Sequence, residues 1–139
     1  MIQIRGLDHV VIRAKHLGEM IAFYRDVLGC VVERESSPEF GLVQLRAGHS
    51  LIDLVSVDGE LGRQGGAAPG EEGHNMDHFC VRLEDFDEAG IRAHLSRFGI
   101  QGSNLENRYG AEGHGPSIYI QDPEGNTVEL KGPPVAGPG

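Results

Sequence analysis

The chain has 139 residues, 21 of them acidic and 12 basic, so its net charge is −9. No cluster of Lys and Arg could follow a phosphate backbone, which argues against nucleic acid and anionic membranes as partners. No stretch approaches the roughly 18 apolar residues that cross a bilayer, and the N-terminus lacks the apolar core of a signal peptide. We therefore expect a soluble, cytoplasmic protein.

The first half of the chain predicts a strand, a helix and three more strands. The first strand starts near His9, and the helix is expected to end at Gly29, where a left-handed residue is wanted. β-rich runs follow at 31–35, 42–46 and 51–57. The apolar residues that share one face of the predicted helix are Leu17, Ile21, Tyr24 and Leu28.

The second half repeats this order. The segment Asp8-His9-Val10-Val11-Ile12-Arg13 returns 69 residues later as Asp77-His78-Phe79-Cys80-Val81-Arg82. A second helix follows, with Asp85 and Glu88 resembling an N-terminal capping arrangement and Gly99 at its end. The apolar residues on one face of this helix are Phe86, Ile91, Leu95 and Phe98.

The later strands of the second half are expected at 117–121 and 127–131, joined by a turn at 122–126, with a fainter strand near 102–106. Each half is thus predicted to be a βαβββ module. We place the first module at 1–57, a Gly-rich linker or mobile loop at 58–75, the second module at 76–132, and a disordered tail at 133–139.

Four side chains recur at matching places in the two modules. His9 and His78 lie on the first strands, and Asp53 and Glu129 lie in otherwise apolar last strands. Either acid alone would be read as a solvent-facing residue of a half-exposed sheet. Their recurrence beside a repeated His predicts metal ligation by His9, His78 and Glu129, with Asp53 as the less certain fourth ligand.

The chain resembles the vicinal oxygen chelate superfamily from Leu7 to Lys131. This superfamily includes glyoxalase I, fosfomycin-resistance proteins, extradiol dioxygenases, methylmalonyl-CoA epimerase and bleomycin-binding proteins. The segments that carry the resemblance are Leu7-Asp8-His9-Val10, Phe23-Tyr24-Arg25-Asp26-Val27-Leu28-Gly29, Met76-Asp77-His78-Phe79 and Asp122-Pro123-Glu124-Gly125-Asn126-Thr127-Val128-Glu129-Leu130.

The resemblance implies an α+β fold in which the two modules form a curved, half-open mixed β-sheet barrel around a metal site, and it implies a homodimer. His9, His78 and Glu129 match the ligands of the metal-dependent members. Asp53 matches an additional acid of glyoxalase-like members, although Glu is usual there. The metal could be Zn, Ni, Co, Mn or Fe.

The function implied is that of a glyoxalase I-like lyase or isomerase, in which a substrate chelates the metal through neighbouring oxygens and Glu129 or Asp53 moves a proton. The alternatives are a fosfomycin-resistance-like transferase or hydrolase, an extradiol dioxygenase, and a metal-free binding protein of the bleomycin-resistance type. The residues expected on the substrate side are Arg108, His114, Ser117 and Tyr119.

Overall fold

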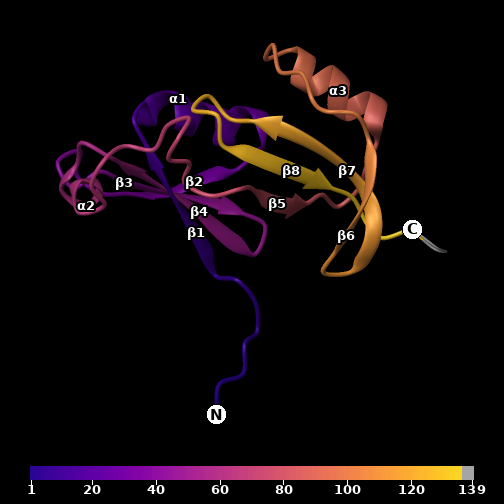
Figure 1. Ribbon diagram of the computed structural model, residues 1–139, viewed down its shortest axis with the longest axis horizontal. Coiled ribbons are helices and arrows are strands. Elements are labelled where there is room, and N and C mark those ends of the chain that lie inside the picture. The colour runs from indigo at the N-terminus through magenta and orange to yellow at the C-terminus, as the bar shows by residue number, and fades with distance from the viewer. Residues whose placement is uncertain (136–139) are drawn as a thin grey trace. The chain divides into compact units, whose positions relative to one another are not determined.

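A computed structural model describes residues 1–135. The chain divides into two compact units, Met1–Asn75 and Met76–Gly139, and each unit holds one open, mixed sheet of four strands (Figure 1). Both units have the order βαβββ, which confirms the predicted α+β fold of two tandem modules. Of the predicted tail, residues 136–139 lie outside the described residues, and the N–H of Val135 donates to the carbonyl of His114 at 2.9 Å.

In the first unit the chain order and the sheet order differ. Its elements are β1 (His9–Ala14), α1 (Leu17–Ala22), a π-helical continuation η1 (Phe23–Val27), β2 (Val31–Glu35), β3 (Leu42–Ala47) and β4 (Ser50–Ser56). The sheet order is β1-β4-β3-β2, with β1 parallel to β4 and the other pairs antiparallel. A short helix, α2 (Glu60–Arg63), lies within the predicted linker.

The core of the first unit lies on one face of its sheet. The helix α1 contacts β4, and the fully buried residues include Met20, Tyr24 and Leu54. Burial of each such side chain stabilises the fold by about 1.5–3 kcal/mol. Strand alternation then directs Asp53 to the opposite face from Ile52 and Leu54, as the sequence predicted.

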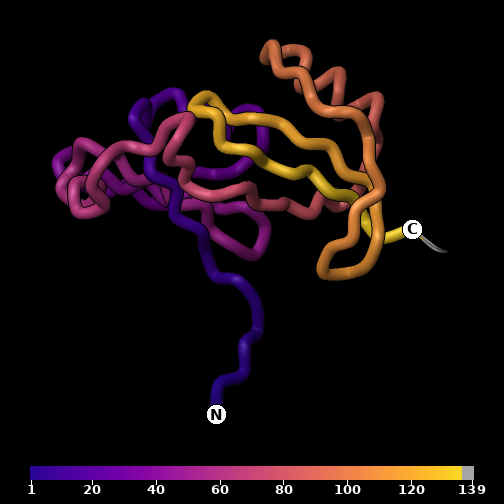
Figure 2. The backbone as a smooth tube through the Cα atoms, in the orientation of Figure 1, coloured from indigo at the N-terminus to yellow at the C-terminus, as the bar shows by residue number. Residues whose placement is uncertain are grey.

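The second unit has the same topology. Its elements are β5 (Phe79–Arg82), α3 (Glu88–Ser96), β6 (Glu106–Gly110), β7 (Gly113–Gln121) and β8 (Thr127–Lys131), and the sheet order is β5-β8-β7-β6. Strand β5 is parallel to β8, and the other pairs are antiparallel. The tight reversals between β6 and β7 and between β7 and β8 are visible in Figure 2.

The turns that bound these elements are largely those that the sequence predicted. Gly29 and Gly99 have φ of 76° and 70°, the left-handed conformation that favours glycine after a helix. In the β7–β8 turn, Asp122 Oδ1 accepts hydrogen bonds from the N–H groups of Glu124 and Asn126, both at 2.9 Å. This side chain therefore organises the turn that leads into β8.

Three local predictions differ from the structure. The faint strand expected near 102–106 is β6 at Glu106–Gly110, and the strand expected at 117–121 is the longer β7, which begins at Gly113. The helix α3 begins at Glu88 with Asp87 as its N-cap residue and no side-chain cap hydrogen bond, so Asp85 does not cap it.

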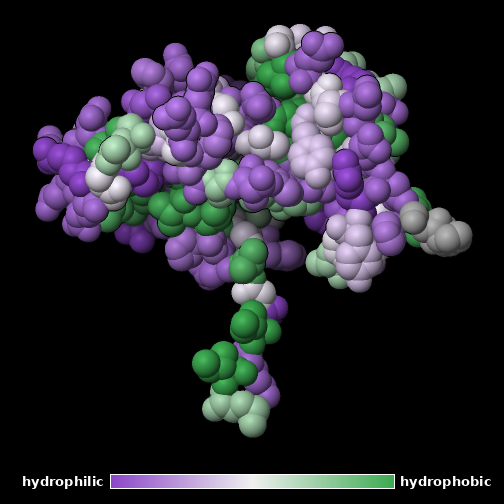
Figure 3. Space-filling model, in the orientation of Figure 1, coloured by the Kyte–Doolittle hydropathy of each residue, from purple (hydrophilic) through white to green (hydrophobic). Residues whose placement is uncertain are grey.

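The N-terminal residues 1–8 precede the first strand and are largely free of contacts with the sheet. Met1, Ile2, Ile4 and Leu7 are exposed, and apolar atoms run along this segment in Figure 3. Ser50 Oγ donates to the carbonyl of Leu7 at 3.0 Å, which ties the end of the segment to β4. Among the described residues, no helix has the length and apolar character needed to cross a membrane.

Candidate metal site

In each unit a histidine and an acid occupy equivalent positions at the two strands that pair in parallel. In the first unit His9 pairs with Leu51, and Asp53 lies two residues further along β4. In the second unit Cys80 pairs with Glu129 across β5 and β8, so His78, two residues before Cys80, stands on the same face as Glu129. The repeat in the sequence is therefore a repeat in geometry, with the histidine and the acid sharing one face of each sheet.

In the second unit the pair is in contact. His78 Nε2 lies 3.2 Å from Glu129 Oε1, and the other ring nitrogen, Nδ1, donates to Asp77 Oδ2 at 2.5 Å. Ser117 Oγ donates to the second carboxylate oxygen of Glu129 at 2.6 Å. Glu129 and Ser117 are both buried. This network holds the carboxylate with one oxygen directed at the imidazole.

The first unit shows a similar but looser arrangement. His9 Nδ1 donates to Asp8 Oδ1 at 2.7 Å, and this hydrogen bond, with a smaller contribution from Asp53, raises the pKa of His9. Asp53 is only 4% exposed, and Gln44 Nε2 donates to its Oδ2 at 3.2 Å. Within residues 1–135 the other oxygen, Oδ1, is buried and has no hydrogen-bond partner.

These residues fit a divalent metal ion. An imidazole whose Nδ1–H is held by a carboxylate presents Nε2 in a fixed orientation, as metal-ligating histidines do. Two adjacent ligands about 2.1 Å from one ion lie about 3 Å apart, close to the separation of His78 Nε2 and Glu129 Oε1. The buried, unpartnered oxygen of Asp53 also suits a cation. Each unit carries two of the predicted ligands, and among the described residues no group of three or more His, Cys, Asp or Glu side chains is gathered as a metal site.

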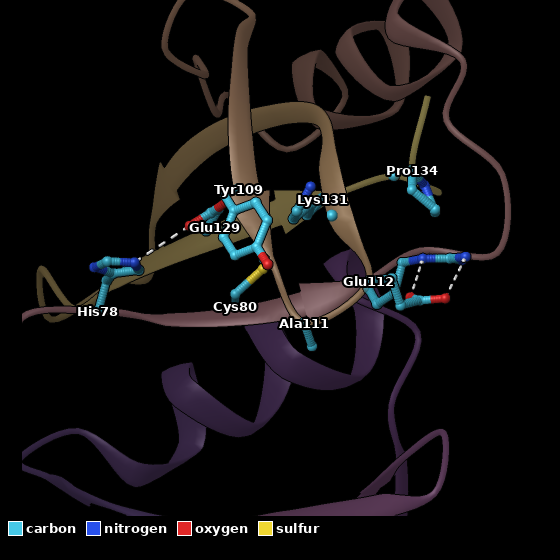
Figure 4. A pocket seen from close by; sticks show the side chains of 12 residues that line it. His78, Cys80, Tyr109, Ala111, Glu112, Glu129, Lys131 and Pro134 are labelled. Carbon is cyan, nitrogen blue, oxygen red and sulfur yellow. Dashed lines mark hydrogen bonds and ion pairs between the residues drawn. The ribbon is translucent and has the colours of Figure 1, made fainter. Parts of the chain in front are cut away.

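A pocket of about 370 Å³ lies beside the His78–Glu129 pair in the second unit (Figure 4). One wall is formed by β5, β8 and the residue directly before β5, and it contains His78, Cys80, Glu129 and Lys131. The other wall is the β6–β7 hairpin around Tyr109 and Glu112. This volume suits a small ligand rather than a macromolecule.

The thiol in this pocket is a poor nucleophile. Desolvation in the pocket wall, and then the nearby Glu129 carboxylate, raise the pKa of Cys80 to about 11. A thiol with so high a pKa is almost fully protonated at neutral pH, and nucleophilic attack requires the thiolate. The pocket therefore presents the Cys80 side chain mainly as a protonated thiol beside the carboxylate of Glu129 and the imidazole of His78.

Three of the four predicted substrate-side residues gather near Glu129. Ser117 binds it directly, Tyr119 lies edge-on to the His78 ring with centroids 5.5 Å apart, and Arg108 lies 5.9 Å above the Tyr119 ring. Burial and then Glu129 raise the pKa of Tyr119. His114 is not brought into this group, because alternation places it on the opposite face of β7 from Ser117.

Sequence reasoning missed three contributors to the site. Asp8 and Asp77 orient the two histidines, and their position directly before each His in the repeat was a usable signal. Lys131 is buried and lines the pocket. The sequence feature that predicts this position is the alternation along β8, since Lys131 follows Glu129 by two residues and therefore lies on the same face.

Comparison with known proteins identifies the family of the chain. A family model described as the Glyoxalase/Bleomycin resistance protein/Dioxygenase superfamily matches residues 6–130, and the chain belongs to this superfamily. The chain is 28% identical over 130 residues to the mitochondrial methylmalonyl-CoA epimerase of Homo sapiens, an alignment that covers 90% of this chain and 72% of that protein.

Two solved structures show the same fold. A virulence protein from Salmonella typhimurium is 25% identical with a TM-score of 0.76, and the match covers 94% of this chain and 98% of that one. The lactoylglutathione lyase of Agrobacterium tumefaciens is 21% identical with a TM-score of 0.67, covering 93% and 94%. The family-model match over residues 6–130 confirms the predicted superfamily.

Proposed function

We propose that this protein is a metal-dependent lyase or isomerase that binds its substrate through two neighbouring oxygens and moves a proton at an adjacent carbon. The observation that carries the proposal is the buried Glu129 carboxylate, held by Ser117 and directed at His78. The matching pair of His9 and Asp53 in the first unit supports it, since together the two pairs supply a two-histidine, two-carboxylate set for one ion.

When bound, a divalent ion at these residues supplies Lewis acidity, stabilising negative charge on a substrate oxygen. His9, His78 and Glu129 would hold it, with Asp53 as a fourth ligand or as a base that does not ligate. Zn, Ni, Co, Mn and Fe all accept imidazole and carboxylate ligands.

Proton transfer is assigned to the carboxylates. A carbon acid next to a carbonyl loses its proton to a base within hydrogen-bond reach, and a carboxylate can serve as that base. Ser117 holds one oxygen of Glu129 while the other faces the pocket side of His78. Asp53 has a buried oxygen that accepts no hydrogen bond within the described residues, which suits the same task.

The human relative is named an epimerase, and inversion of a carbon centre by removal and return of a proton is the chemistry that this site would perform. A second candidate is an epoxide-opening transferase or hydrolase of the fosfomycin-resistance type. It is favoured by the placement of Ser117 and Tyr119, a Ser-x-Tyr pair, beside Glu129. The raised pKa of Cys80, about 11, disfavours its thiol as the nucleophile in that reaction.

Solvent hydrogen exchange tests the proposal without a known product. The zinc-loaded protein is incubated in D₂O with a panel of 2-oxo acids, 2-hydroxy acids and acyl thioesters, and deuterium at the carbon next to the carbonyl is measured by NMR. We expect enzyme-dependent exchange with at least one compound and its loss in Glu129→Gln. Ser96→Ala, a change at an exposed helix residue, is the matched control. Exchange that is unchanged in Glu129→Gln would refute the role of this carboxylate.

We also propose that the protein is a homodimer whose metal sites combine His9 and Asp53 of one copy with His78 and Glu129 of the other. Each sheet has open edges, which association with a second copy would cover. If sites are shared, a mixed dimer of His9→Ala and Glu129→Ala has both lesions in one site and an intact second site, so random mixing restores about a quarter of the sites. No recovery of bound metal in confirmed mixed dimers would exclude shared sites.

A further inference from the structure

Among the described residues, one basic side chain in the pocket of the second unit has no hydrogen-bond or ion-pair partner. Lys131 is 7% exposed, and its Nζ is buried without a hydrogen bond to any residue of the described chain. It lies on β8 opposite Arg82 of β5 and Ser117 of β7, on the face that carries Glu129. Figure 4 shows Lys131 in the pocket wall between Glu129 and Pro134. Burial of an unpaired ammonium group is costly, so its retention calls for a physical reason.

The acids that could neutralise Lys131 are already engaged. Glu112 forms an ion pair with Arg82, with Oε1 and Nε 2.9 Å apart. Glu129 accepts from Ser117 and faces His78, and it makes no ion pair with Lys131. The pocket is lined by two acids, Glu112 and Glu129, and two basic residues, Arg82 and Lys131. Among the described residues, Lys131 is the one of these four whose charged atom has no hydrogen bond or ion pair.

The backbone around Lys131 is shaped to admit it. A Cβ atom at Gly110 would lie 2.6 Å from Lys131 Cε, and one at Gly115 would lie 2.9 Å from both Lys131 Nζ and the carbonyl oxygen of Pro133. Contacts this short do not occur between real side chains, so any larger residue at either position would force the lysine to move. Two glycines of the β6–β7 hairpin thus leave the space that the lysine side chain occupies, all within the second unit.

We propose that Lys131 binds an anionic group of the substrate, a carboxylate or a phosphate. Residues two apart on a strand are separated by about 7 Å, so this group would be held about 7 Å along β8 from the position of Glu129. The inference rests on the proposed function in that it places the reacting oxygens at Glu129 and the anionic group at the far end of the same pocket. The substrate class is then a small acid with an anionic group beyond the two chelating oxygens.

The chain is well suited to a direct test, because Lys15 and Lys131 are its two lysines and Lys15 is exposed. The full chain is acetylated to low extent with the N-hydroxysuccinimide ester of acetic acid, and the two sites are quantified by peptide mass spectrometry. Succinate and inorganic phosphate are the probes, succinamide is the neutral control, and the ionic strength is kept constant. The succinate and phosphate arms distinguish the two kinds of anion.

We expect at least one anionic probe to slow acetylation of Lys131 about fivefold or more, with no change at Lys15 and none with succinamide. Calorimetric titration with the same probe should show binding weakened about tenfold or more in Lys131→Met, kept within about threefold in Lys131→Arg, and unchanged in Lys15→Met. The acetylation arm uses the unaltered protein, so it remains valid if Lys131→Met fails to fold.

Equal acetylation of Lys131 with and without both anions would overturn the proposal, as would equal affinity in a folded Lys131→Met variant. The measurements are made on metal-stripped and zinc-loaded protein, with bound zinc determined in each sample. Absence of zinc binding with Lys131 still protected would refute the proposed function and support the anion site. Zinc binding with unprotected Lys131 would refute the anion site alone.

Discussion

Replacement of Ser117 by Ala should destabilise the metal-free protein by about 2 kcal/mol. Ser117 is fully buried, and its hydroxyl donates to Glu129 Oε2 at 2.6 Å. Hydrogen bonds to charged groups contribute about 1.5–3 kcal/mol, and removal of one partner leaves the other desolvated. The remaining contact of Glu129 with His78 keeps the expected loss within that range rather than above it.

Urea unfolding at pH 7, followed by far-UV circular dichroism, measures this loss as a change in midpoint at constant slope. Ser96→Ala, at an exposed position near the end of α3, should stay within about 0.5 kcal/mol of the parent protein. The same substitution at Ser117 should also weaken zinc binding about tenfold or more, because the hydroxyl orients a proposed ligand. A loss below about 0.5 kcal/mol at Ser117 would refute the view that this hydrogen bond holds the carboxylate.

Three other predictions concern the chemistry of the site. The pKa of about 11 at Cys80 lowers its thiolate fraction at pH 8 about a hundredfold relative to an unshifted thiol. Alkylation of Cys80 by iodoacetamide, measured by peptide mass spectrometry, should therefore be correspondingly slow. It should be faster in Glu129→Gln, because the Glu129 carboxylate contributes to the raised pKa. The hydrogen bond that the His9 ring donates to Asp8 raises the pKa of His9, so the ring keeps its proton to higher pH. Asp8→Asn should therefore move the NMR titration of His9 to lower pH, and an unchanged midpoint would contradict this. Asp53→Ala should reduce zinc affinity, measured by calorimetry, less than Glu129→Ala does, because the shorter Asp side chain reaches a shared metal ion less readily. An equal or greater loss of affinity in Asp53→Ala would contradict this ranking of the two carboxylates.

Much of the fold could be predicted because each module marks its own elements. The apolar alternation of β4 and β8 and the helix-ending Gly29 and Gly99 are local signals, and the repeat made each of them visible twice. The sequence places β6 too early in the chain because four of its five residues are exposed and polar or aromatic. The strand therefore lacks the alternation of apolar and polar residues that would mark it. Its strand conformation comes from pairing with β7, a contact made by folding.

The candidate site was predictable in part for a similar reason. Alternation on paired strands is sufficient to place His78 and Glu129 on one face. The bond from Ser117 to Glu129 and the isolation of Lys131 depend on side-chain conformations and on the glycines of a neighbouring hairpin, which sequence spacing does not specify. His114 was grouped with the substrate residues from its nearness in sequence, whereas the strand alternates it to the other face.

The central claim is that His9, His78 and Glu129 bind a divalent metal ion, and metal content tests it most directly. The full chain, purified without added metal and then equilibrated with Zn²⁺ and desalted, is assayed by inductively coupled plasma mass spectrometry beside His78→Ala and a control variant, His94→Ala, altered on α3. The account predicts about one ion per chain in the parent and control and a large loss in His78→Ala. Zinc retained in full by a folded His78→Ala variant would contradict it.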